Sequence, residues 1–172
     1  MNKQKKFKVG DKIVEFGQVF RIFKIEAKKD SEGNEERILH FRPYFKSNDN
    51  KGMICSIPET SIKDTNIRRP VSKDTVKELI VKLSTKPKKD VETDVNSVKE
   101  VLGQNDVFET ATVLRTLWVE RATAESFTKS KKDMLEMAVS RLVEEVALVV
   151  DLTVDKANDK IKGALSKVHK TL

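Results

Sequence analysis

The spacing of apolar residues changes near residue 70, and this change constrains the fold more than any other feature of the sequence. Before that point the stretch 18–27 has a period of two, in which the face of Phe20, Ile22, Lys24 and Glu26 starts apolar and becomes charged. After it, apolar residues recur every three to four positions, beginning with Val76, Leu79, Ile80 and Leu83. A period of two is typical of half-buried strands and a period near 3.6 of amphipathic helices. The sequence therefore predicts an α+β protein in two parts, a β module over 1–71 and a helical domain over 72–172.

The β module is predicted as several short strands joined by tight turns. Gly17 permits a turn between the first two strands, and Pro43 places the third strand at an edge or ends it. Several short strands joined by tight turns predict a small, strongly bent sheet or barrel. The expected strands are 7–16, 18–27, 37–45 and 52–57, with turns at 30–34 and 47–50.

The helical domain is predicted as a compact bundle of about five helices. Ser72 is expected to cap the first helix, since short polar side chains cap helix N-termini, and two later helices are expected to begin at Asp106 and Thr153. Gly103 is expected to end a helix whose apolar positions start at Val91. Ser130 and Asp133 resemble a capping box that opens the helix over 130–149.

Charge is concentrated in the first part of the chain. The net charge is +7, and residues 1–71 carry 16 Lys and Arg against 10 Asp and Glu, leaving 18 against 17 for the rest. A basic module attracts an acidic partner, either a protein or a nucleic acid. The longest purely apolar run is Val146–Val150, too short to span a bilayer. No apolar segment follows the basic N-terminus, so we expect a cytoplasmic protein without a membrane partner.

Residues that catalysis requires do not cluster in the sequence. There are two histidines, far apart, and no Gly-rich phosphate loop or Cys/His metal set. Glu144 and Glu145 are adjacent on a predicted helix, so we interpret them as solvated surface. Cys55 is interpreted as a buried structural thiol. We expect no enzymatic activity, no cofactor and no metal.

Several segments in both parts resemble one family of bacterial transcription regulators. The combination of both parts in one order resembles the CarD family, also called CdnL, over roughly residues 6–165. The segments that carry the resemblance in the first part are Phe7–Val14, Ile25-Glu26, Ile57-Pro58 and Asn66–Ser72. In the second part they are Leu114–Trp118, Met134–Ala138, Leu142–Ala147 and Leu152–Ala157.

The resemblance implies a Tudor-like N-terminal module that binds the RNA polymerase β subunit, partly through an exposed strand edge. Lys28 stands where the family has one polymerase-contacting arginine, and Ser56 stands where it has another. The second contact is therefore expected to be lost or moved to Lys51 or Arg42.

The resemblance also implies that the helical domain contacts promoter DNA beside the melted region and stabilises the open complex. The family inserts a tryptophan there, and Val91 stands near that position, followed by acidic residues. Lys132 corresponds to a basic residue that the family keeps. Trp118 matches a tryptophan of the family's helical core. Six lysines are candidates for phosphate contact: Lys86, Lys88, Lys89, Lys129, Lys131 and Lys132.

Two alternatives remain open. Without DNA contact, the protein would be an adaptor that acts through polymerase alone. A basic Tudor-like module could instead bind RNA or the ribosome, although stacking aromatics on a flat strand face are few. We expect a monomer.

Overall fold

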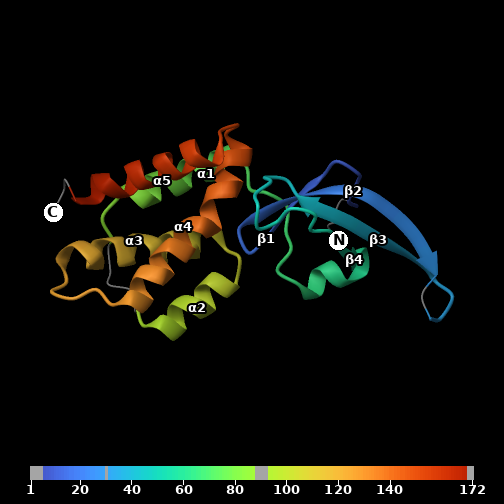
Figure 1. The fold of residues 1–172 in the computed structure, drawn as a ribbon, viewed down its shortest axis with the longest axis horizontal. Coiled ribbons are helices and arrows are strands. Elements are labelled where there is room, and N and C mark those ends of the chain that lie inside the picture. The colour runs from blue at the N-terminus through green and yellow to red at the C-terminus, as the bar shows by residue number, and fades with distance from the viewer. Residues whose placement is uncertain (1–5, 30, 88–92, 170–172) are drawn as a thin grey trace. The chain divides into compact units, whose positions relative to one another are not determined.

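The computed structural model describes residues 6–29, 31–87 and 93–169 and has the α+β composition that the sequence predicts. It separates into two compact units, Met1–Pro70 and Val71–Leu172. The first contains the sheet and the second the helices, as Figure 1 shows.

The described residues of the first unit form a four-stranded antiparallel sheet in the order β1-β2-β3-β4. Its strands are β1 (Lys12–Glu15), β2 (Gln18–Lys29), β3 (Glu35–Pro43) and β4 (Cys55–Pro58), followed by the 3₁₀ helix η1 (Glu59–Asp64). The loop between β1 and β2 has two residues, Phe16 and Gly17, both with positive φ. That conformation suits a hairpin with right-handed strand twist. The long β2 and β3 strands run side by side and curve together in Figure 1.

A bulge at Phe23 divides β2 into a part inside the core and a part that extends beyond it. The register shifts between Ile22 and Lys24, so that Ile22 pairs with Phe41 and Lys24 with His40. Bulges bend a strand and increase its twist. The core lies against one face of the sheet and consists of Ile13, Phe20, Ile22, Leu39, Phe41 and Ile67. The other face is buried at Val14 and Val19 and carries Glu26, His40 and Ser56 farther along the sheet.

In its described residues the second unit contains five helices, with α3 and α4 in the middle. The helices are α1 (Lys73–Ser84), α2 (Val95–Gly103), α3 (Val107–Thr123), α4 (Lys129–Val149) and α5 (Val154–His169). Helices α1 and α5 pack on one side of the α3–α4 pair and α2 packs on the other (Figure 1). The expected stripes are buried, including Leu79, Leu114, Leu142 and Ile161, each at most 1% exposed.

Two predicted helix ends are wrong, and so is the prediction that Glu145 is solvated surface. The cap of α4 is Thr128, whose hydroxyl accepts from the backbone N–H of Lys131, so Ser130 lies inside the helix. Gly103 is also inside its helix, and Asn105 takes the left-handed conformation beyond the end of α2. Asparagine tolerates that conformation because its short side chain bonds locally. The position of Val91 lies outside the described residues, and the helix begins at Val95.

The third correction concerns Glu145, which is 1% exposed and not solvated surface. Its carboxylate accepts the backbone N–H of Val71 at 2.8 Å. A buried carboxylate needs such partners because desolvation penalises an unpaired charge. The predicted cap Ser72 is confirmed by its side-chain hydrogen bond, and the helix expected from Asp106 begins at Val107 with Asp106 as its cap.

Candidate functional site

A chain of polar contacts crosses the face of the sheet that lies opposite the core. Ser56 on β4 lies opposite His40 on β3, and its Oγ is 2.7 Å from His40 Nδ1. His40 Nε2 is 3.0 Å from Glu26 Oε2 on β2. Glu26 in turn forms ion pairs with Lys24 and Lys28, the latter at 3.6 Å. The structure therefore connects Lys28 and Ser56, two predicted contact residues that are 28 positions apart.

Glu26 remains ionised at the centre of this network. Hydrogen bonds from Lys24 and His40 lower its pKa from 4.5 to about 2. A hydrogen bond to the charged form of a carboxyl favours that form. The side chain of Lys28 is 62% exposed, so its ammonium group can also reach a partner.

A second group of predicted residues lines a pocket of about 280 Å³ beside the start of β4. Arg42 and Lys51 both line it, together with Lys46, Met53 and Ile54. Met53 is 42% exposed and Ile54 65% exposed. Cationic groups thus surround exposed apolar side chains. This composition suits a ligand that is both acidic and apolar.

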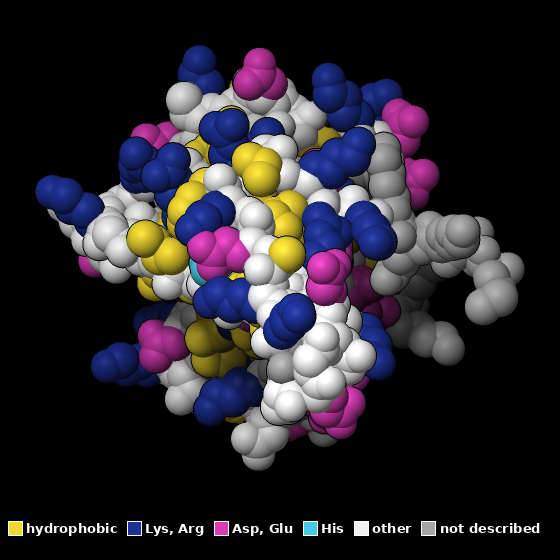
Figure 2. Space-filling view, turned by 90° about the vertical axis from the view of Figure 1, so that its right-hand side faces the viewer, with side chains coloured by type: hydrophobic (Ala, Val, Ile, Leu, Met, Phe, Trp, Pro, Cys, Tyr) yellow, Lys and Arg dark blue, Asp and Glu magenta, His cyan; other side chains and the backbone are white. Residues whose placement is uncertain are grey.

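Phe23, the bulge residue, links the network to this pocket. Its ring centroid is 6.3 Å from that of His40, and the guanidinium of Arg42 lies 5.3 Å from it. Figure 2 views the protein from the side of the β2–β3 hairpin. Lysine and arginine side chains predominate there around a smaller number of hydrophobic ones. The network and the pocket therefore form one connected group, which includes Lys28, Arg42, Lys51 and Ser56. We call this group the sheet-face surface.

This surface borders an unpaired strand edge. Strand β4 pairs with β3 on one side, and within the described part of the chain no strand pairs with its other side. An open edge presents backbone N–H and C=O groups to which another chain can add a strand.

The first turn of α4 holds three of the predicted DNA-contacting lysines, and they differ in environment. Lys129 and Lys132 are exposed. Lys131 is half-buried and pairs with Glu120 on α3, whose other carboxylate oxygen accepts from Thr93 at 2.7 Å. Burial alone would raise the pKa of Glu120, but the hydrogen bonds from Lys131 and Thr93 lower it below the ordinary value. Lys131 therefore joins α4 to α3.

The same contacts place Thr93, which precedes α2, beside the first turn of α4. Thr93 also lies 3.3 Å from Lys131 Nζ. The end of α1 is held by Arg115, which donates to the carbonyls of Lys82 and Thr85 at 2.9 Å each. Lys86 follows and is exposed. Lys88 and Lys89 lie outside the described residues, as does the Val91 position.

Comparison with known proteins identifies the helical unit. The sequence matches the family described as CarD, C-terminal domain, over residues 75–162, which is just over half of the chain. The chain belongs to the CarD family. This family comprises RNA polymerase-associated transcription regulators that act without catalysing a reaction. A comparison with curated protein sequences gives no match.

The CarD match covers α1 to α4 and the first part of α5, including Trp118. Trp118 is half-buried on α3, next to the fully buried Leu117. None of the helices in the described part combines the length and apolar character that crossing a membrane requires. Within the same residues, no cluster of three or more potential ligands could hold a metal ion.

Sequence reasoning missed two residues that organise the sheet-face surface of this CarD protein, His40 and Glu26. Each lies at a position where strand alternation turns its side chain away from the core. The signal was that alternation, but the bulge at Phe23 shifts the pairing by one residue. Because the sequence does not reveal that bulge, the cross-strand partner of His40 could not be deduced from it.

Proposed function

We propose that this CarD protein binds the RNA polymerase β subunit through the sheet-face surface and the open edge of β4. The observation that supports the proposal is that four predicted contact residues are connected across the sheet face beside an unpaired strand edge. A strand of the partner would extend the sheet through main-chain hydrogen bonds. Lys28, Arg42 and Lys51 would then select a partner strand with acidic neighbours, and Met53 and Ile54 would cover its apolar side chains.

Ser56 gives this surface a different chemistry from the arginine that the family resemblance implies there. The Ser56 hydroxyl bonds to His40, which is held by Glu26. Positive charge is therefore supplied from other strands of the sheet, by Lys28 on β2 and by Arg42 on β3. Arg42 is the more directional group because a guanidinium presents a planar set of donors.

We further propose that the α4 N-terminus contacts promoter DNA beside the melted region. Lys129 and Lys132 are exposed in the first turn, where the helix dipole also favours phosphate. Binding that is tighter to melted than to closed DNA would shift the equilibrium toward the open complex. Helix α4 would thus add affinity for phosphate without a base-inserting tryptophan at the position of Val91.

The adaptor alternative has one specific observation in its favour. Lys131 is paired with Glu120, so one predicted phosphate contact is already engaged inside the protein. In that alternative the protein would act through polymerase alone. Salt dependence separates the two, because phosphate contacts weaken steeply as salt rises.

The decisive experiment measures binding of the wild-type chain to the isolated lobe of the cognate β subunit by biolayer interferometry. Arg42→Glu and Lys28→Glu are compared with Lys8→Glu, an exposed lysine outside the sheet-face surface. We expect each of the first two to weaken binding by about tenfold, since reversing a rim charge costs roughly 1–2 kcal/mol. Equal binding by all three variants would contradict the assigned surface. No binding by the wild-type chain would contradict the polymerase function, and binding to RNA instead would favour the RNA or ribosome alternative.

A further inference from the structure

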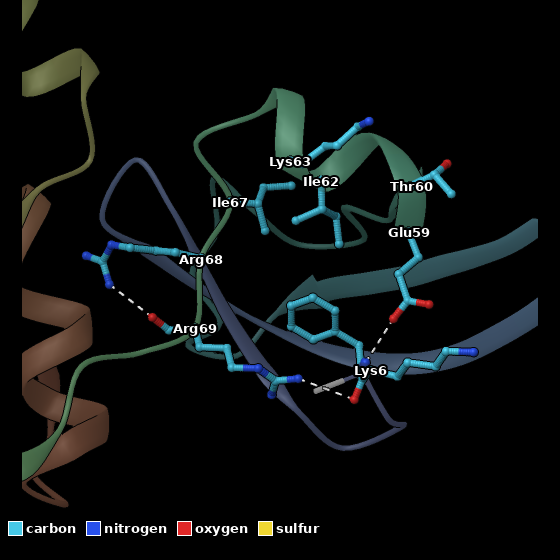
Figure 3. A pocket seen from close by; sticks show the side chains of 9 residues that line it. Lys6, Glu59, Thr60, Ile62, Lys63, Ile67, Arg68 and Arg69 are labelled. Carbon is cyan, nitrogen blue, oxygen red and sulfur yellow. Dashed lines mark hydrogen bonds between the residues drawn. The ribbon is translucent and has the colours of Figure 1, made fainter. Parts of the chain in front are cut away.

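The first unit has a second and larger pocket that shares no residue with the sheet-face surface. Its volume is about 670 Å³, within the range of cavities that bind ligands. Residues from the N-terminal segment, η1 and the segment after it form its walls. Figure 3 shows Ile62 and Ile67 pointing into it, and Phe7 also lines it. The interior is therefore largely apolar.

The one acidic residue among the described lining residues is neutralised. Glu59 pairs with the guanidinium of Arg37 and accepts the backbone N–H of Phe7 at 2.9 Å. Arg37 also donates to the carbonyl of Phe7 at 2.7 Å. These three residues fix the N-terminal segment against η1. The wall of the pocket is thus held in place by paired, partly buried groups, which reduces the cost of ordering on binding.

Cations surround the opening of this pocket. Lys6, Lys63, Arg68 and Arg69 all contribute to its lining. In Figure 3 the ammonium groups of Lys6 and Lys63 lie at the ends of side chains that extend away from the cavity. Arg69 covers the ring of Phe7 at 4.1 Å. The positive groups therefore lie around an apolar interior and do not converge within it.

This arrangement distinguishes between two kinds of anionic ligand. A nucleotide needs several cations that converge on its phosphates, and the interior here offers apolar side chains and the carboxylate of Glu59. An acidic peptide needs an apolar recess for one anchoring side chain and cations outside the recess. Such an anchor in a desolvated pocket typically dominates the binding energy of a peptide. The geometry matches the second case.

We propose that this pocket, the Phe7–Ile67 pocket, docks an acidic, extended peptide segment of a partner protein. One bulky apolar side chain of that segment enters between Phe7, Ile62 and Ile67, and its acidic neighbours meet Lys6 and Lys63. The proposal concerns a different surface from the polymerase contact and does not depend on it. The protein would thereby hold a second protein while its sheet-face surface stays open.

The test uses a fluorescein-labelled peptide in which one phenylalanine is flanked by aspartates on both sides. Matched peptides carry alanine in place of phenylalanine, or lysines in place of the aspartates. Binding to the full chain is measured by fluorescence polarisation, and the contact is located by amide shifts in ¹⁵N NMR spectra. We expect saturable binding of the first peptide alone, with shifts at Phe7, Ile62 and Ile67.

Lys63→Glu and Lys6→Glu should each weaken this binding by about fivefold, while Lys29→Glu, an exposed lysine at the end of β2, should leave it within about twofold. These exposed positions preserve the fold, which the NMR spectra verify directly. Equal binding of the alanine peptide, shifts at Arg42 and Ile54, or no saturation at millimolar peptide would each overturn the proposal. Binding of Lys63→Glu to the β lobe is measured in parallel. Retained lobe binding with lost peptide binding separates this pocket from the polymerase surface.

Discussion

Lys131 and Lys132 are adjacent in α4, and the structure predicts opposite consequences when each is replaced by methionine. Lys131 is engaged with Glu120 and Thr93, whereas Lys132 is exposed. Methionine keeps much of the apolar stem of lysine and removes the charge. We expect Lys131→Met to reduce stability and leave DNA binding largely unchanged. Lys132→Met should weaken DNA binding and leave stability unchanged.

The magnitudes follow from burial. The side chains of Lys131 and Glu120 are each 24% exposed. Exposed ion pairs contribute about 0–1 kcal/mol, and breaking a buried pair costs about 3–5 kcal/mol. For this intermediate burial we expect a loss of about 2 kcal/mol. In a unit of this size, that loss lowers Tm by about 10 °C. Lys132→Met should change the free energy of unfolding by less than about 0.5 kcal/mol.

Thermal unfolding followed by circular dichroism measures the first effect. The second is measured as the salt dependence of binding to forked promoter DNA, at a temperature where both variants are folded. Loss of one phosphate contact reduces the slope of log K against log salt by about 0.9. Equal stability of the two variants would refute the structural role of Lys131. A reduced slope for Lys131→Met, with none for Lys132→Met, would refute the division of roles.

Arg115→Met removes two charge-assisted hydrogen bonds to the carbonyls of Lys82 and Thr85. It should lower the free energy of unfolding by about 2–3 kcal/mol, as measured by urea denaturation. An unchanged urea midpoint would show that the end of α1 does not need these bonds. Lowering of the Glu26 pKa from 4.5 to about 2 means that its carboxylate stabilises the folded state above pH 4.5 and that this contribution is lost as the pH falls toward 2. Glu26→Gln should therefore flatten the dependence of the urea midpoint on pH across that interval, and an unchanged profile would contradict the network. Ser56→Arg should strengthen binding to the β lobe by about fivefold, since it adds an exposed charge beside the open edge of β4; weaker binding would indicate that the Ser56 hydroxyl itself contacts the partner.

The helices were predictable because their signals are local. An apolar stripe and a cap such as Ser72 depend on residues a few positions apart, and the structure confirms that cap. The errors arose where two local solutions compete. Thr128 and Ser130 can both cap α4, and the structure uses the earlier one. The sequence alone does not rank them, because the choice also sets where Lys131 meets Glu120 on another helix.

Glu145 shows a different limit. Its neighbour in sequence, Glu144, has the same chemistry, and helical spacing places the two on different faces. Which face is buried depends on what packs against it. Glu145 and Val71, whose backbone it contacts, are 74 residues apart in sequence, so no local pattern reveals the contact.

A β part and a helical part, a concentration of positive charge in the first, and the residues that resemble CarD contacts can all be predicted from the sequence. These properties depend on composition and short-range periodicity. Which of those residues meet depends on the tertiary structure. The bulge at Phe23 sets the register that joins Lys28 to Ser56 through His40, and packing of α3 against α4 engages Lys131 with Glu120. Cross-strand register and helix packing are long-range interactions, and a linear pattern of residues does not encode them locally.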